Sequence, residues 1–330
     1  AAGFTLKLVG KRWAGPLLAG QGWAPAPLPA GTGARIQLLR DLRRSTPPVT
    51  APRGQADALL LTNSFSSALE ARLAGLRPLG YRQDGRGWLL TRGLAPPAGG
   101  HESARFDRLA RALLEDRMRT GGSPSGSADA TEPLGATGFP EATQSAEPIR
   151  PRLALAPAAR AAAEALLDRH LGPHPDGAAP RFACLVPFAT GTLKGANKAW
   201  PAFPDFAAEL ARELPVIVVP GPAEVDQARE HYPACQRLED VDLGVYAALL
   251  ARAAVVIAND TGPAHVAAAV GAPLVSVLGP SDASRYRPLG PDVTLVQASP
   301  WPRVAEVRSA VDRCLARHSS VPCRDPSPVD

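Results

Sequence analysis

The sequence lacks a long apolar run, a secretory leader and a metal-binding cysteine pattern. No apolar stretch reaches the roughly 18 residues that a membrane-spanning helix needs. Residues 1–25 contain Lys7, Lys11 and Arg12 and no apolar core of a leader, so we expect no signal peptide there. The four cysteines are scattered without metal-ligand spacing, which indicates reduced thiols in the cytoplasm.

Motifs of three common enzyme classes are also absent: a GxGxxG after a strand, a Walker loop and a GxSxG. Hydride transfer, kinase chemistry and serine hydrolysis are therefore weakly supported. Lysine is scarce, because only 4 of the 36 basic residues are lysines. The net charge of +5 fits an anionic substrate or surface, but it is too diffuse to indicate nucleic acid.

The length of 330 residues and the alternation of apolar runs with helical segments favour two α/β, Rossmann-like domains. We predict an N-terminal domain over residues 1–172 and a C-terminal domain over 173–330. Residues 120–150, rich in Gly, Ser, Pro and Thr, are predicted to form a flexible loop. The predicted strands are 4–9, 58–61, 78–81, 182–186, 215–219, 254–258, 274–278 and 293–296.

The clearest pattern lies in residues 253–282. Two short apolar runs flank a helix that begins near Pro263 and ends at Gly271, which predicts buried parallel strands joined by a helix. Ligands of such sheets bind outside the carboxyl ends of the strands. The polar residues that fall there are Asp260, Thr261, His265, Ser281 and Asp282.

The turn at Asp260-Thr261-Gly262 opens the helix, and a helix N-terminus suits a pyrophosphate. Two less specific interpretations remain open. Asp260 or Thr261 is an ordinary N-cap in one of them, and His265 is a structural histidine in the other.

Two further charged positions follow predicted strands of the same domain. Lys194 and Lys198 lie in one loop, where an ammonium group could neutralise a diphosphate or could simply be solvated. Glu224 follows the strand 215–219, where a carboxylate can bind ribose hydroxyls or favour a helix start. In the N-terminal half, Asn63, Ser64 and Ser66 could hydrogen-bond a sugar or cap the next helix.

Together these motifs resemble glycosyltransferase family nine, the ADP-heptose:lipopolysaccharide heptosyltransferases. Residues 259–282 are similar to the family's pattern D-T-G-x-x-H followed by G-x-P and G-P-[ST]-D. Residues 198–201 resemble its K-x-W-P, and residues 221–224 resemble its Gly-rich loop with an acid. Residues 63–82 look like the heptosyltransferase II branch.

The resemblance implies a GT-B architecture of two Rossmann-like domains that face a cleft. It implies inverting transfer of heptose from ADP-L-glycero-D-manno-heptose to the inner core of lipid-linked lipopolysaccharide, without a tightly bound metal or other cofactor. The partners would be this nucleotide sugar and the lipid-linked acceptor, with no nucleic acid. The location would be cytoplasmic, peripheral to the inner membrane face.

By motif, the resemblance places Lys198 by the donor phosphates and Glu224 by the adenosine ribose. It places Asp260, with the amides of Thr261 and Gly262, by the heptose and diphosphate. His265 and Ser281 would support that donor site, and Lys194 is added from its local chemistry. Asn63, Ser64 and Ser66 would lie on the acceptor side.

The family opens with a strand and a Gly-Asp loop whose Asp is the expected general base, and we identify no counterpart in residues 1–57. We therefore assign no catalytic residue and expect an incomplete N-terminal sheet with an exposed edge. Two alternatives remain: a donor-binding but inactive homologue, and a family-nine transferase that uses another nucleotide sugar.

Overall fold

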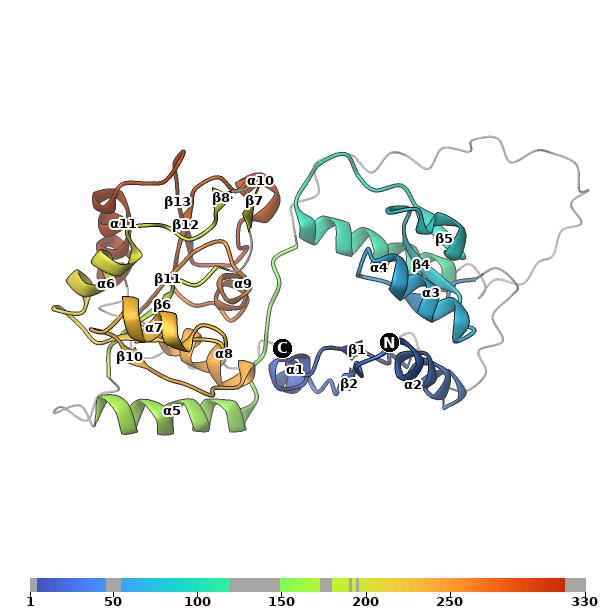
Figure 1. The fold of residues 1–330 in the computed structure, drawn as a ribbon, viewed down its shortest axis with the longest axis horizontal. Helices are drawn as coiled ribbons and strands as arrows, with labels where there is room; N and C mark the ends of the chain where they lie inside the picture. Colours follow the sequence, from blue (N-terminus) through green and yellow to red (C-terminus); the bar gives the residue numbers. More distant parts are fainter. Residues whose placement is uncertain are drawn as a thin grey trace, which may run out of the picture. The chain divides into compact units, whose positions relative to one another are not determined.

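The structure is a computed structural model that describes residues 5–45, 55–118, 149–172, 180–189, 192–193 and 196–317. The chain divides into two compact units (Figure 1). The first unit comprises residues 1–7 and 28–149, and the second comprises residues 8–27 and 150–330.

The second unit is built on a parallel sheet with the strand order β10-β9-β6-β11-β12-β13. Its strands are β6 (Ala183–Val186), β9 (Val216–Val218), β10 (Gln236–Arg237), β11 (Val255–Ala258), β12 (Leu274–Leu278) and β13 (Val293–Gln297). Its helices are α1 (Ala14–Leu18), η1 (Ala19–Gln21), α5 (Pro157–Leu171), α6 (Phe203–Leu210), α7 (Val225–His231), α8 (Leu243–Arg252), α9 (Gly262–Ala269), α10 (Ala283–Tyr286) and α11 (Val304–Arg317). Two short pairs complete it: β1 (Val9–Gly10) with β2 (Ala26–Pro27), and β7 (Thr192–Leu193) with β8 (Ala196–Asn197).

Helices cover both faces of this sheet, because alternate side chains of each central strand enter two different cores. On β11, Val256 and Ala258 pack with α5, α8 and α9, whereas Val255 and Ile257 pack with α6 and α11. The strand order reverses between β6 and β11, which are hydrogen-bonded neighbours. This is the topological switch point, where doubly wound sheets bind their ligands.

The first unit has a smaller parallel sheet of three strands, β3 (Ala58–Leu59), β4 (Pro78–Tyr81) and β5 (Arg92–Leu94). Its helices are α2 (Thr32–Arg44), α3 (Phe65–Leu73), η2 (Arg86–Leu89) and α4 (Glu102–Met118). Its buried apolar residues form two small clusters, one between the sheet and α4 and one between α3 and η2. No helix in the described ranges is long and apolar enough to cross a bilayer.

The predicted domain boundary at residue 172 is wrong. Helix α5 packs against α8 (Figure 1), and its Ala163 and Leu167 enter the core of the second unit. The boundary between the compact units lies between Ile149 and Arg150. Residues 8–27 also belong to the second unit, since α1 packs on α8. Gly244 permits this approach, because a Cβ there would lie 2.6 Å from the carbonyl oxygen of Pro16. The flexible loop predicted over 120–150 falls almost wholly outside the described residues.

Candidate functional site

Asn259, at the carboxyl end of β11, joins three segments at the switch point. It is fully buried. Its Nδ2 donates to the carbonyl oxygen of Pro187 at 2.6 Å, and its Oδ1 accepts from the backbone N–H of Trp200 at 3.0 Å. The loop after β6 and the segment that carries Lys198 are therefore fixed against β11. Both polar atoms of the Asn259 side chain thus bind other parts of the protein.

Asp260, the next residue, lies between a hydroxyl and an ammonium group. Ser281 Oγ donates to Asp260 Oδ2 at 2.6 Å, and Lys198 Nζ approaches the same oxygen at 3.5 Å. The Asp260 side chain is only 9% exposed, whereas that of Lys198 is 25% exposed. The ammonium group therefore compensates the carboxylate and keeps a face toward the solvent, where it can meet an anion.

Helix α9 begins directly after this pair, with Thr261 at the N-cap position. Thr261 has extended backbone angles, φ −143° and ψ 165°, and its side chain makes no capping hydrogen bond. The interpretation of this turn as an ordinary side-chain cap is therefore wrong. The backbone N–H groups of Thr261 and Gly262 are the ones that can meet an anion, because Pro263 has no N–H and Ala264 donates its own to the carbonyl oxygen of Thr261 at 3.1 Å. The positive end of the helix dipole favours an anion there.

These residues line one cleft of about 350 Å³ within the second unit. The cleft has a polar wall, formed by the start of α9 with Lys198 and Asp260, and a more apolar wall from the ends of β6 and β9 and from α8. The lining residues are Val186, Phe188, Lys198, Val219, Glu224, Tyr246, Asp260, Thr261, Gly262, Pro263 and His265. A cleft with one anion-binding end and one apolar end suits a nucleotide.

Glu224 lies on the same cleft, at the start of α7. The backbone N–H of Gly221 donates to its Oε2 at 2.8 Å, which fixes the carboxylate and leaves its other oxygen for a ligand. Tyr246 of α8 lies nearby. Burial raises the pKa of the Tyr246 phenol well above its ordinary value, and the negative charge of the Glu224 carboxylate raises it further. Tyr246 is therefore a neutral part of the wall.

Six of the eight predicted donor-site residues line this single cleft: Lys198, Glu224, Asp260, Thr261, Gly262 and His265. Ser281 is 3% exposed and lies behind Asp260, so it holds the carboxylate rather than facing the cleft. Lys194 lies outside the described residues. Sequence reasoning missed Phe188 and Tyr246. The position of Phe188, just beyond β6, could have indicated it, but Tyr246 belongs to an apolar helix pattern that gives no such signal.

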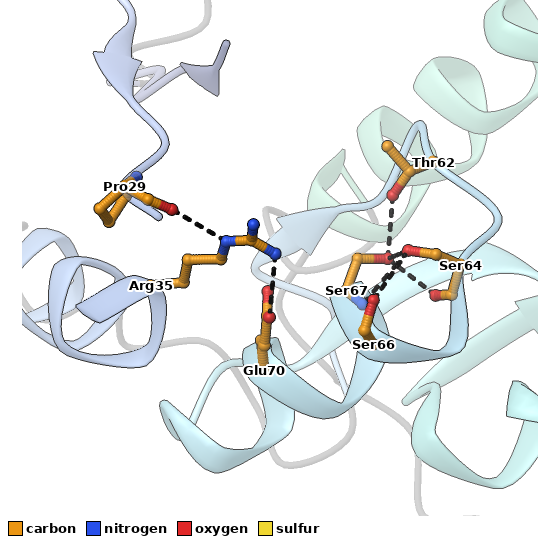
Figure 2. A network of polar contacts seen from close by, with 7 residues as sticks. All are labelled: Pro29, Arg35, Thr62, Ser64, Ser66, Ser67 and Glu70. Carbon is orange, nitrogen blue, oxygen red and sulfur yellow. Dashed lines mark hydrogen bonds and ion pairs between the residues drawn. The ribbon is translucent and has the colours of Figure 1, made fainter. Parts of the chain in front are cut away.

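The acceptor-side residues are exposed in the first unit: Asn63 and Ser64 precede α3, and Ser66 lies in its first turn. Figure 2 shows Ser64 and Ser66. Ser64 caps α3, because its Oγ accepts from the backbone N–H of Ser67 at 3.3 Å, and Ser66 Oγ donates to the same oxygen at 3.4 Å. Asn63 Oδ1 accepts from Nη2 of the buried Arg86 at 3.1 Å. The capping role of Ser64 is confirmed, and sugar binding by Asn63, Ser64 and Ser66 stays a prediction.

The described residues contain no group of three or more His, Cys, Asp or Glu side chains placed to hold a metal ion. Three of the four cysteines, Cys184, Cys235 and Cys314, are buried as free thiols. The expectation that the protein needs no tightly bound metal stays a prediction.

The model of a known protein family matches most of this chain. The model of glycosyltransferase family 9 (heptosyltransferase) matches residues 53–310. No curated protein sequence matches the chain.

Solved structures show the same fold. The Escherichia coli ADP-heptose lipopolysaccharide heptosyltransferase II is 19% identical over 97% of this chain and 92% of its own, with a TM-score of 0.68. The E. coli heptosyltransferase WaaC with ADP is 18% identical over 96% and 91%, with a TM-score of 0.54. A family 9 glycosyl transferase from Veillonella parvula is 15% identical over 83% and 70%, with a TM-score of 0.57. The α/β, GT-B fold class is confirmed.

Proposed function

Because the chain belongs to glycosyltransferase family 9, the heptosyltransferase family, we propose that it transfers heptose from ADP-L-glycero-D-manno-heptose to the inner core of lipopolysaccharide. The protein is a glycosyltransferase; the donor and the acceptor are what we propose. One observation carries the donor: a cationic side chain, an uncapped helix N-terminus and a fixed carboxylate line one cleft at the switch point.

The charges of this cleft match the parts of a nucleoside diphosphate sugar. Lys198 and the N–H groups at the start of α9 compensate the diphosphate, so no metal ion is needed for that purpose. Glu224 accepts hydrogen bonds from ribose hydroxyls, while Val219 and Tyr246 form the apolar wall for the nucleoside. The related WaaC structures are named as complexes with ADP and with ADP-2-deoxy-2-fluoro heptose, which supports an adenine nucleotide.

In this proposal Asp260, which lines the cleft next to Lys198, would accept hydrogen bonds from heptose hydroxyls beside the diphosphate. Ser281 keeps its carboxylate in place, and Lys198 limits its repulsion of the phosphates. His265, one turn into α9, also lines the cleft and supports the site. The leaving ADP carries the negative charge that develops as the glycosidic bond breaks, and the same cation and helix end stabilise it.

Inversion requires a base to take the proton of the acceptor hydroxyl as the new bond forms. We assign no described residue to that role. On the acceptor side, Asn63, Ser64 and Ser66 offer hydroxyl and amide groups to a sugar, and the lipid-linked acceptor would bring the protein to the cytoplasmic face of the inner membrane. A donor-binding homologue without activity, or a transferase that uses another nucleotide sugar, is the alternative.

Calorimetric titration of the full chain tests the donor assignment. We expect ADP-heptose and ADP to bind at least about tenfold more tightly than the corresponding UDP and GDP ligands. Lys198→Met should weaken ADP binding about tenfold to a hundredfold, because a charge-assisted contact to phosphate is lost. Arg212→Gln, which removes an exposed cation from the same unit, is the matched control and should change nothing.

Each outcome separates two candidates. Equal affinities for ADP, UDP and GDP would overturn the donor assignment. Tight ADP-heptose binding without release of ADP in the presence of a lipopolysaccharide core acceptor would favour the inactive homologue. Release that disappears in Asp260→Ala would exclude it.

A further inference from the structure

Large apolar side chains lie exposed on the first unit where α3 meets η2. Trp88 of η2 is 72% exposed, Leu61 before α3 is 53% exposed and Phe65 at the start of α3 is 40% exposed. The rings of Phe65 and Trp88 are in contact, with centroids 6.2 Å apart. We call Leu61, Phe65 and Trp88 the α3–η2 patch. Clustered exposed aromatic and aliphatic side chains mark an interaction surface more often than scattered ones do.

The patch is the outer side of a well-packed element. Leu89 and Leu90, directly after Trp88, are buried together with Ala68 of α3, and Leu60 packs against them. The backbone of η2 is thus fixed from beneath, and this fixed geometry directs Trp88 outward. A rigid platform loses little conformational entropy when it binds a partner.

Four exposed arginines lie near the C-terminal end of α3 and beside η2. Arg40 of α2 donates to the carbonyl oxygen of Leu73 at the end of α3, and Arg43 lies against Gly75. Arg72 donates to Thr91 just beyond η2, and Arg82 lies against Gly87 and Gly93. None of the four forms a salt bridge with another described residue, unlike Arg35, which pairs with the buried Glu70 (Figure 2). Their charges are available to an anionic partner.

The two units also differ in overall charge. The first unit contains 16 Lys and Arg against 12 Asp and Glu, a net +4. The second unit contains 20 against 19, a net +1. The excess of positive charge therefore lies mainly on the unit that exposes the α3–η2 patch.

We propose that the α3–η2 patch, with Arg40, Arg43, Arg72 and Arg82, docks the protein on an anionic lipid bilayer. Tryptophan prefers the membrane interface, phenylalanine and leucine enter the acyl boundary, and guanidinium groups bind lipid phosphates. Leu61 and Phe65 offer apolar surface and no hydrogen-bonding side chain, which suits lipid better than a free glycan. The inference deepens the proposed function and rests on it for the choice of a lipid-linked acceptor.

Sedimentation of the full chain with vesicles tests the docking surface. The vesicles contain phosphatidylcholine alone or an equimolar mixture with phosphatidylglycerol. We expect binding to the anionic vesicles, little binding to the neutral ones, and a decrease as salt is raised. Trp88→Ser should weaken binding about tenfold, because it removes apolar area from the interface. The double variant Arg72→Gln with Arg82→Gln should weaken it about thirtyfold.

Matched controls lie in the second unit. Trp23→Ser removes another exposed tryptophan, 49% exposed, and Arg212→Gln with Arg313→Gln removes the same charge from exposed positions. Both should leave vesicle binding unchanged. The proposal is overturned if the full chain does not bind anionic vesicles, or if the controls weaken binding as much as the patch variants. Concentration-dependent dimerisation lost in Trp88→Ser, without vesicle binding, would overturn it in favour of a protein partner.

The outcome is independent of the donor site, because the cleft lies wholly in the second unit. Trp88→Ser should bind ADP as the original chain does. Normal ADP binding with no vesicle binding would overturn only the proposed docking surface. Vesicle binding without selectivity for ADP would overturn only the proposed donor.

Discussion

The two units differ in how deeply their strands are buried and in where their polar side chains lie. In the second unit, the strands β6, β9, β11 and β12 are buried along their whole length, and polar side chains gather where they end. In the first unit, three short strands support shallow cores, and the loop before α3 is held from beneath by one buried arginine. The second unit can therefore hold the charged groups of a ligand in place, whereas the first unit presents loops and apolar side chains to a larger partner.

We expect the largest effect from a substitution of Asn259, whose side chain joins three segments of the second unit by hydrogen bonds. Asn259→Ala removes the side chain that donates to the buried carbonyl oxygen of Pro187 and accepts from the backbone N–H of Trp200. We expect the free energy of unfolding of this unit to fall by about 2–4 kcal/mol and ADP binding to be lost with the displaced Lys198 segment. Hydrogen exchange resolved by peptide measures the second unit separately from the first.

The exposed Asn63→Ala is the matched control, since it removes an amide that accepts one hydrogen bond from Arg86. It should cost the first unit no more than about 1 kcal/mol and leave ADP affinity unchanged. Equal effects of the two variants would contradict the difference between a buried and an exposed polar junction.

We expect a smaller effect from a substitution of Arg86, the buried arginine that joins several segments of the first unit by hydrogen bonds. Arg86 is fully buried, and its guanidinium donates to the carbonyl oxygens of Thr62, Ser64 and Tyr81. Burial lowers the pKa of this guanidinium below its ordinary value. Arg86→Met should destabilise the first unit by about 2 kcal/mol, because the orphaned carbonyl groups outweigh the removal of a buried charge.

Hydrogen exchange of the peptide that contains residues 61–67 measures that loss, while peptides of the second unit and ADP affinity should not change. Arg72→Met, at an exposed position of the same unit, is the control and should alter stability by less than about 0.5 kcal/mol. Loss of ADP binding in Arg86→Met would show that the cleft depends on the first unit.

The smallest expected effect concerns the buried cysteines of the second unit, which we expect not to react with thiol reagents. Burial raises the pKa of the Cys184 thiol to about 12, and the pKa values of Cys235 and Cys314 to about 11. We therefore expect thiol reagents to leave all three unmodified in the folded protein near pH 8. Peptide mapping identifies which cysteine reacts and separates them from Cys323, which lies outside the described residues. Rapid modification of Cys184 would show that the deep core opens.

The same shifts give the sign of a pH effect. These thiols ionise more readily when unfolded, so their contribution to stability is complete below the ordinary pKa of 9. It is lost as the pH rises toward 11 for Cys235 and Cys314 and toward 12 for Cys184. The second unit should lose stability in that range. The described part of the first unit contains no cysteine and lacks this contribution.

Much of the second unit could be predicted from local sequence. The strand predicted over 274–278 is β12 to the residue, and that over 182–186 differs from β6 by one residue at its start. Long apolar runs identify strands that are buried on both faces. The strands β5 and β10 were missed, because Arg92–Leu94 and Gln236–Arg237 carry polar residues and are strands only through their pairing with β4 and β9.

The sequence by itself determined the family, the alternation of helices and strands, and the residue types that line the proposed donor cleft. Those features depend on short motifs and on periodicity, which are local. Only the tertiary structure decided that α5 belongs to the second unit, that Ser281 supports Asp260 and that Tyr246 forms a wall of the cleft. It alone decided that Trp88 is exposed while Leu89 is buried. Burial and contact depend on which distant segments pack together, and the order of residues along a chain does not state that.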